Sequence, residues 1–325
     1  MICLGVESTA HTFGIGVAKG NGEMLCNVWD MYKPPGGWGI KPQEAAIHHR
    51  KVSKEVLEKA LSQARISLKD VDFFAFSQGP GLPPCLREGL SFTKSIAGKK
   101  PFFGVNHCIA HVEIGRLYTG LKDPVTLYVS GANTQVLAFA EGRYRCFGET
   151  MDVGIGNALD KFGREVGVEF PAGPKIEKLA ERGRYVELPY VVKGMDLSFS
   201  GIITEALSRY KKGESVENLC YSIQETLFAM LTEVTERAMA HTGKTELLLT
   251  GGVASNSRLQ EMLGIMCRER GALFRTVPRE VSGDNGAMIA WTGILIKKSL
   301  KKPPTRADRI FPRQRTDEVD VFWRR

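Results

Sequence analysis

Two histidines in the first half of the chain are spaced for a shared chemical task. His107 and His111 lie four residues apart in the stretch Asn106-His107-Cys108-Ile109-Ala110-His111. On a helix this spacing places both imidazoles on one face, where they can converge on one metal ion. The alternative is a chance pair, because the chain has six histidines and His48-His49 form another pair. The residue after His107 is a cysteine, so the general base of an HExxH metalloprotease motif is missing.

A third ligand has to come from a distant part of the sequence. Asp284 stands in the stretch Ser282-Gly283-Asp284-Asn285-Gly286, just before an expected helix. Its carboxylate could simply cap that helix, which is a common role for aspartate. Two histidines and one carboxylate would instead hold an ion and leave coordination positions open for a substrate.

Glycine-containing turns follow several apolar strands. Ser130-Gly131-Ala132-Asn133 comes after one strand, and Gly251-Gly252 joins another to a helix. Backbone N–H groups in such turns can hold phosphate oxygens, although glycine also serves plain tight turns. The sequence contains neither a P-loop nor a GxGxxG motif. The repeated turns therefore favour a nucleotide cleft of another kind.

Two carboxylates lie near further glycines. Asp160 follows Gly154-Ile155-Gly156, and Glu177 follows the turn around Gly173. Carboxylates accept hydrogen bonds from paired ribose hydroxyls, but either residue alone is more commonly a solvated helix charge.

The elements that must position these residues occur in a repeated order. Apolar runs and turns predict strands at 2–7, 11–18 and 23–31, followed by alternating helices and strands to 117. A similar order of three strands, then helices and strands, begins again at Val125. This pattern predicts an α/β protein with two lobes and a cleft between them. We expect an N-terminal lobe at 1–123, a C-terminal lobe at 124–300 and a basic tail at 301–325.

Composition limits the function classes. The 325 residues are 43% hydrophobic and 25% charged, as in a soluble globular protein, and no apolar run is long enough to span a membrane. Seven scattered cysteines without a CxxC pair predict a reducing, cytoplasmic location and disfavour a cysteine-based zinc site. Much of the net charge of +8 comes from Lys297 onward. That tail is either a solvated segment or a contact for a phosphate backbone.

Five stretches together resemble the TsaD family, the universal tRNA threonylcarbamoyladenosine transferases. The resemblance is closest to the archaeal and eukaryotic form, the catalytic subunit of the KEOPS complex, and it covers nearly the whole chain. The matching stretches are Ser77 to Leu82, Gly104 to His111, Leu127 to Gln135, Lys193 to Gly201, and Gly283 to Met288. The resemblance implies the duplicated actin-like ATPase (ASKHA) fold, which agrees with the two predicted lobes.

The resemblance also implies a role for each candidate residue. His107, His111 and Asp284 would be catalytic residues that bind one divalent metal, iron or else zinc, with the Tyr128 hydroxyl as a further ligand. The rest would bind an adenine nucleotide or threonylcarbamoyl-adenylate. For the phosphate and acyl part these are Tyr128, Val129, Ser130, Gly131 and Ala132; for the nucleoside they are Asp160, Gly173, Glu177 and Asn256.

The implied reaction transfers the threonylcarbamoyl group to N6 of the adenosine beside the anticodon, in tRNAs that read codons beginning with A. A separate synthase would supply the adenylate. Implied partners are tRNA and the KEOPS subunits, including a small dimerising subunit and a small atypical protein kinase that is fused to this subunit in some archaea.

The sequence departs from the family pattern at a few positions. Ala132 stands where the family commonly has glycine, and a need for positive φ there would strain the loop. Two alternatives from other classes remain at this point. One is a metalloendopeptidase, which the cysteine after His107 disfavours, and the other is a non-catalytic scaffold that binds nucleotides or DNA.

Overall fold

The chain forms two compact units, each built around one five-stranded sheet. The computed structural model describes residues 1–34, 39–300 and 307–324. The first unit comprises Met1–Tyr118, Ala140–Tyr144 and Asp284–Arg325, and the second comprises Thr119–Phe139 and Arg145–Gly283. In the described part of the chain, each helix is too short or too polar to cross a lipid bilayer.

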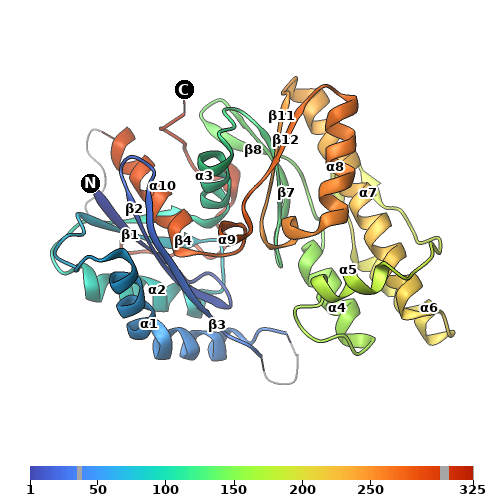
Figure 1. Cartoon of the computed structure of the whole chain (residues 1–325), viewed down its shortest axis with the longest axis horizontal. Coiled ribbons are helices and arrows are strands. Elements are labelled where there is room, and N and C mark those ends of the chain that lie inside the picture. Colours follow the sequence, from blue (N-terminus) through green and yellow to red (C-terminus); the bar gives the residue numbers. More distant parts are fainter. Residues whose placement is uncertain (35–38, 301–306, 325) are drawn as a thin grey trace. The chain divides into compact units, whose positions relative to one another are not determined.

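The first sheet has the order β3-β2-β1-β4-β5 (Figure 1). Strand β1 pairs antiparallel with β2 and parallel with β4, so that Gly5 lies opposite both Gly16 and Ala75. The helices α1 and α2 pack against strands of this sheet, as does α10. The strands are β1 (Ile2–Glu7), β2 (Thr12–Lys19), β3 (Met24–Met31), β4 (Phe73–Gly79) and β5 (Phe102–Asn106); the helices are α1 (Pro42–Ala64), α2 (Pro83–Ala97), α3 (His107–Thr119) and α10 (Gly286–Ser299).

Small residues explain why α10 belongs to the first unit. A Cβ added to Gly5 would lie 2.3 Å from the backbone nitrogen of Ala290, and one added to Gly16 would lie 2.2 Å from that of Ala287. The helix therefore rests directly on the backbone of β1 and β2. The sequence order predicted residues 124–300 as one lobe, and the division in the structure differs because this helix packs on the first sheet.

The second sheet repeats the topology with the order β12-β11-β6-β7-β8. Strand β6 pairs antiparallel with β7 and parallel with β11, as β1 does with β2 and β4. The predicted duplication is therefore confirmed at the level of strand pairing. The strands are β6 (Val125–Val129), β7 (Thr134–Ala140), β8 (Arg143–Glu149), β11 (Glu246–Thr250) and β12 (Leu273–Thr276), and a small hairpin is formed by β9 (Val192–Lys193) and β10 (Asp196–Leu197).

Helices of the second unit bury one extensive apolar core with their sheet. Long α7 contributes much of it, with Leu227, Leu231 and Val234 fully buried against strand residues such as Leu127 and Leu249. Burial of this apolar area is the main force that holds the unit together. The helices are α4 (Ile155–Glu165), α5 (Gly173–Ala180), α6 (Ser200–Lys211), α7 (Val216–Thr242), α8 (Ser257–Glu269) and α9 (Arg279–Ser282).

Most of the predicted elements are confirmed to within a few residues of their ends. Helix α6 and the β9–β10 hairpin are not anticipated by the sequence pattern. The start of α6 depends on Asp152, whose carboxylate accepts hydrogen bonds from the backbone N–H groups of Phe199 and Ser200 at 3.0 and 2.9 Å. Because this cap comes from a residue almost fifty positions away, local periodicity does not reveal it.

Candidate metal centre and nucleotide-binding residues

The two histidines lie on the first two turns of α3. The preceding strand β5 ends at Asn106, whose Oδ1 accepts a hydrogen bond from Ile109 N at 3.1 Å and so caps α3. The rings of His107 and His111 face each other, with centroids 4.8 Å apart and planes at 82°. Both are almost fully buried. The predicted shared face is therefore present.

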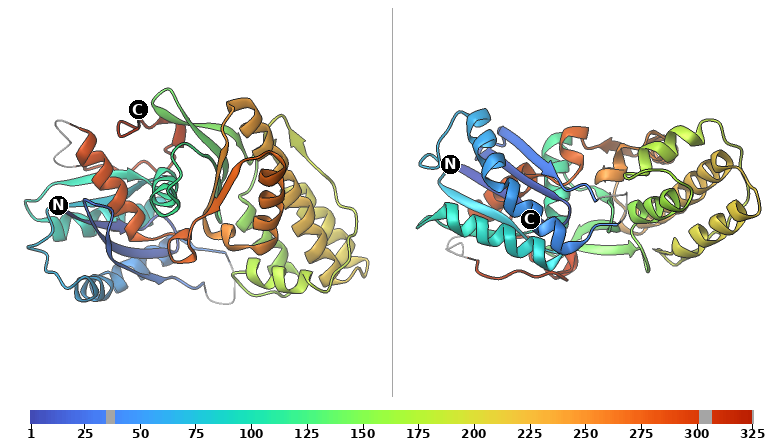
Figure 2. Two further views of the ribbon diagram at one scale, coloured as in Figure 1. Left: turned by 45° about the horizontal axis from the view of Figure 1, so that its top comes forward. Right: turned by 90° about the horizontal axis from the view of Figure 1, so that it is seen from below.

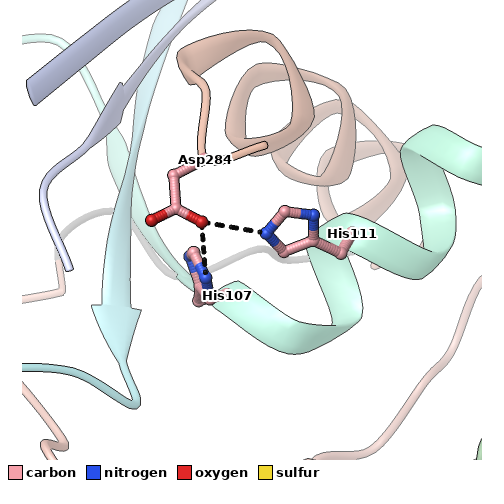
Figure 3. A group of neighbouring side chains, drawn as sticks. All are labelled: His107, His111 and Asp284. Atoms are coloured by element: carbon pink, nitrogen blue, oxygen red, sulfur yellow. Dashed lines mark hydrogen bonds and ion pairs between the residues drawn. The ribbon is translucent and has the colours of Figure 1, made fainter. Parts of the chain in front are cut away.

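Asp284 completes a three-residue group with these histidines (Figure 3). Its Oδ1 lies 3.4 Å from His107 Nε2 and 3.3 Å from His111 Nε2, and the three possible ligand atoms all lie within 4.8 Å of one another. Helix capping, the alternative role for Asp284, is not what the structure shows. Asn285 caps α10 instead, because its Oδ1 accepts from Met288 N at 3.0 Å. The carboxylate of Asp284 is thus directed at the imidazoles.

The charge states of Asp284 and His111 suit a cation. Burial raises the pKa of Asp284, but the two imidazoles oppose this and hold the pKa well below its ordinary value. Burial lowers the pKa of His111, so its imidazole is neutral near pH 7. Neutral imidazole and ionised carboxylate are the states that bind metals. Two nitrogen ligands and one oxygen ligand fit zinc or iron with open positions for a substrate.

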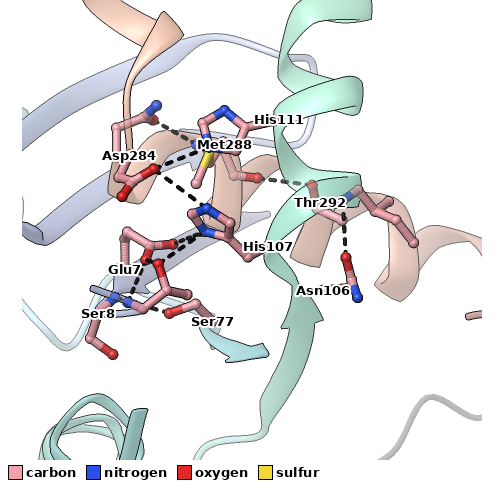
Figure 4. A network of polar contacts seen from close by, with 12 residues as sticks. Glu7, Ser8, Ser77, Asn106, His107, His111, Asp284, Met288 and Thr292 are labelled. Carbon is pink, nitrogen blue, oxygen red and sulfur yellow. Dashed lines mark hydrogen bonds and ion pairs between the residues drawn. The ribbon is translucent and has the colours of Figure 1, made fainter. Parts of the chain in front are cut away.

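Glu7 is a functional residue that sequence reasoning missed (Figure 4). It ends β1 and is fully buried, and its Oε2 lies 2.9 Å from His107 Nδ1. Its other oxygen accepts hydrogen bonds from the backbone N–H and the hydroxyl of Thr9, both at 2.6 Å. Because a carboxylate only accepts, Nδ1 of His107 donates to Glu7, and Nε2 is the nitrogen that faces Asp284. Metal-binding histidines are commonly oriented in this way.

In the second unit, the predicted phosphate loop is a tight turn between β6 and β7. Tyr128 and Val129 are buried at the end of β6, and Ser130 N donates to Asn133 O at 2.8 Å. The turn packs on the start of α4, because Gly156 N donates to Ser130 O and Asn157 N donates to Gly131 O. The described non-glycine residues with positive φ are Arg65 and Glu141. Ala132 is therefore accommodated without the strain that the sequence suggested.

The four predicted nucleoside contacts lie on neighbouring elements of the second unit. Asp160 on α4 accepts from Ala172 N at 2.8 Å, beside Gly173 at the start of α5. Glu177 on α5 accepts from Ser257 N at 2.8 Å, at the start of α8. Asn256 caps α8 through Leu259 N at 3.1 Å and donates to Gln224 at 3.0 Å. Contacts thus connect these residues, and each polar side chain also has a structural role.

Comparison with known proteins gives the same family as these residues. The family described as TsaD, tRNA N6-adenosine threonylcarbamoyltransferase, matches residues 23–291. The tRNA N6-adenosine threonylcarbamoyltransferase of Thermococcus kodakarensis is 55% identical over 327 residues, which cover 99% of this chain and 100% of that protein. A "probable bifunctional tRNA threonylcarbamoyladenosine biosynthesis protein" of Methanocaldococcus jannaschii is 51% identical over 326 residues, which cover 99% of this chain and 60% of that protein.

Solved structures confirm the predicted fold class. Full-length HypF, crystallised in a phosphate- and nucleotide-bound form, matches 93% of this chain and 56% of its own length with a TM-score of 0.64 at 14% identity. A likeness at this identity shows the ASKHA fold alone. The function follows from the sequence relatives and not from the fold. By its family match and by identities above 50% along almost its whole length, this chain belongs to the TsaD family of tRNA N6-adenosine threonylcarbamoyltransferases.

Proposed function

We propose that the chain forms threonylcarbamoyladenosine in tRNA with a divalent metal ion held by His107, His111 and Asp284. The observation that carries this proposal is the convergence of three ligand atoms within 4.8 Å. The pKa of Asp284 is lowered and that of His111 is lowered, so these two ligands are in states that suit a cation. An ion bound there would polarise the carbamoyl carbonyl or orient the threonyl carboxylate of the donor. Iron is our first expectation and zinc the second.

Other residues of the chain would orient the metal ligands and bind the donor. Glu7 fixes the ring of His107, so this ligand needs no reorganisation when the donor binds. In the second unit, the backbone of residues 128–132 would receive the phosphate of threonylcarbamoyl-adenylate and stabilise the leaving AMP. An exocyclic amine such as adenine N6 is a weak nucleophile, so we assign much of the rate to positioning.

The nucleoside part of the donor would lie against α4, α5 and α8. A Cβ added to Gly173 would meet nothing closer than Leu159 Cδ1 at 3.9 Å. The packing of the protein therefore does not require glycine there, which supports a role in the close approach of a ligand. Asp160 and Glu177 would accept from the ribose hydroxyls, and Asn256 would contact the adenosine.

We further propose that the acceptor is the adenosine beside the anticodon, in tRNAs that read codons beginning with A. A separate synthase would supply the adenylate, and the chain would act within a KEOPS complex with a small kinase and a small dimerising subunit. The bifunctional name of the M. jannaschii relative supports a second protein working with this one. All seven cysteines are free thiols, which supports a cytoplasmic location.

The experiment replaces His107 or His111 with alanine and measures both metal content and modified tRNA. The assay contains tRNA, threonine, bicarbonate, ATP, the synthase and the accessory subunits. We expect metal binding to be lost and the transfer rate to fall at least about 100-fold. His48→Ala is the matched control, because His48 lies in the same unit and pairs with Asp30. Full transfer by metal-free His107→Ala protein would remove the ion from the mechanism.

The two alternatives lose support. In the structure Glu7 contacts Nδ1 of His107, the nitrogen that faces away from Asp284, so it orients a ligand and does not take the place of the missing protease base. The family relationship gives an acyltransferase and not a non-catalytic scaffold.

A further inference from the structure

The C-terminal segment Ala307–Arg324 follows the edge of the first unit and does not behave as a solvated tail. Ala307 N donates to the carbonyl of Phe102 at 3.2 Å, and Phe311 N donates to that of Gln78 at 2.8 Å. The side chain of Gln78 in turn donates to Arg309 O at 2.9 Å. These bonds fasten the segment to the end of β4 and the start of β5, the strand that leads into α3.

The segment then reaches the first turn of α3. Gln314 Oε1 accepts a hydrogen bond from Asn106 Nδ2 at 3.2 Å, and the other end of the Asn106 amide caps α3. Thr316, which is 2% exposed, hydrogen-bonds the thiol of Cys108. The residues on both sides of His107 are therefore held by the C-terminal segment.

A buried carboxylate ties the end of the segment to the middle of α3. Glu113 is 1% exposed, and its Oε1 accepts from Trp323 Nε1 at 2.8 Å and from the Tyr144 hydroxyl at 2.5 Å. Its Oε2 accepts from Arg116 at 2.7 Å. Arg324 donates to the Tyr144 hydroxyl at 3.1 Å and lies 5.3 Å from the centre of that ring. A buried carboxylate needs hydrogen-bond donors, and Trp323 is one of the donors to Glu113.

Helix geometry places Glu113 on a different side of α3 from the two histidines. At about 100° per residue, Glu113 points roughly 200° away from His111, while His107 and His111 differ by only about 40°. One face of α3 thus presents the imidazoles to Asp284, and the other face is held by Glu113. A rotation of α3 that moved the imidazoles would have to break the bonds on the far face. Figures 1 and 2 show the red C-terminal end close to α3.

We propose that the segment Ala307–Arg324 is a brace that fixes the rotation of α3, and that Glu113 and Trp323 are positioning residues for the two histidine ligands. This inference rests on the proposed metal centre, but it assigns a task to residues that neither touch the ion nor face it. It also gives the basic C-terminal segment a role other than contact with a phosphate backbone.

The test compares the full chain with Trp323→Phe, which keeps an aromatic ring and removes the N–H donor. The first measurement is the dissociation constant for Co²⁺, with its visible absorption spectrum as a report on coordination geometry. The second is hydrogen exchange of the amides of residues 108–116 in the metal-free protein. We expect affinity to fall roughly 10-fold, a changed spectrum and faster exchange in α3.

Two further variants separate the brace from a general loss of stability. Trp29→Phe makes the same change at a half-exposed tryptophan of β3 in the same unit, and we expect it to change neither Co²⁺ affinity nor exchange in α3. Tyr144→Phe removes another donor to Glu113 from outside the segment and should change both in the same direction as Trp323→Phe. Measurements are made well below the melting temperature of every variant.

The outcomes distinguish the brace from the metal centre on which it rests. If the wild-type protein bound no Co²⁺, the metal centre and the positioning role would both be wrong. If the wild type bound Co²⁺ and Trp323→Phe bound it equally well, the metal centre would stand and the positioning role would be overturned. The positioning role would be overturned even if exchange in α3 became faster, because a loosened helix with intact affinity is a structural effect only.

Discussion

The two units place different chemistry at the same point of the same topology. In the first unit β1 ends at Glu7, a buried carboxylate that contacts His107. In the second unit β6 ends at the uncharged Val129, and the next residue, Ser130, has a hydroxyl that accepts from Asn133 N at 3.1 Å. The negative charge of Glu7 at the end of β1 favours a cation nearby, whereas the uncharged turn after β6, with its backbone N–H groups, suits an anion.

The duplicated sheet is therefore a common framework, and the residues at its strand ends decide the function of each half. Histidine follows the same division, since five of the six lie in the first unit and His241 alone lies in the second. The metal centre and the proposed nucleotide contacts can therefore be perturbed separately. The first unit should respond to protons and to metals, and the second should respond to the steric fit of its turns.

Acid should weaken the first unit before the second, and His49 should contribute a separable part of this effect. Burial, followed by the charge of His48, lowers the pKa of His49 to about 4. In the unfolded chain His49 takes up a proton near pH 6.5, whereas in the folded chain it does so only near pH 4. The free energy of unfolding therefore falls as the pH drops from 6.5 to about 4. The loss from this residue is about 3 kcal/mol. Urea unfolding of metal-free protein at about pH 7, 5.5 and 4.5 measures it.

His49→Asn is the variant that isolates this residue, because it removes the titration while retaining polar atoms. We expect its unfolding free energy to depend less on pH than that of the wild type. His241→Asn, at an exposed position of the second unit, should leave the wild-type dependence intact. Equal pH dependence in all three proteins would contradict the assignment to His49.

Neutralising Glu7 should weaken metal binding by His107, His111 and Asp284. In Glu7→Gln the group that faces His107 Nδ1 loses its charge and no longer fixes the ring as firmly. We expect Co²⁺ affinity to fall by about 10-fold to 100-fold with little change in fold. Asp30→Asn is the matched control, since it neutralises the carboxylate that faces His48 at 3.0 Å in the same unit. An unchanged Co²⁺ affinity in Glu7→Gln would mean that the charge of Glu7 does not contribute to metal binding.

The sequence predicts the residues of this centre where the signal lies within one helix, and it misses those that depend on a distant part of the chain. His107 and His111 follow from their spacing on one helix, and Asn106 follows from its type at the start of that helix. Glu7 lies one hundred positions from His107, and an acid at the end of an apolar strand has no spacing that points to a partner. The strand pairing that joins them is a property of the sheet, which periodicity does not specify.

The division of the chain shows the same limit. The strands of the two five-stranded sheets and most helices can be assigned from apolar runs and turn residues, and the repeated order predicts two sheets. Nothing in that order says that α10 packs on Gly5 and Gly16, because small residues on a strand are also consistent with other partners. Likewise Glu113 looks like an ordinary helix charge until Trp323, more than two hundred positions away, is placed against it.

A steric change in the second unit should disturb the turn without affecting the metal. A Cβ at Gly154 would lie 2.4 Å from the carbonyl carbon of Ala132, so Gly154→Ala must push the turn away from α4. We expect the second unit to lose about 2 kcal/mol of stability and adenine nucleotide affinity to fall, while Co²⁺ affinity stays the same. Gly201→Ala, where the added Cβ meets nothing within 4 Å, is the control and should be neutral or stabilising. Loss of Co²⁺ binding in Gly154→Ala would show that the two units are not independent.

The smallest expected effect separates a ligand contact from a packing requirement. Gly173 has room for a Cβ within the protein, so Gly173→Ala should change the free energy of unfolding by less than about 0.5 kcal/mol. If the adenosine approaches this backbone closely, the added methyl group collides with the ligand alone, and affinity for an adenine nucleotide should fall roughly 10-fold. Calorimetric titration of both proteins measures this. Because Gly154→Ala acts through the fold and Gly173→Ala does not, equal nucleotide affinity in wild type and Gly173→Ala would place the adenosine elsewhere.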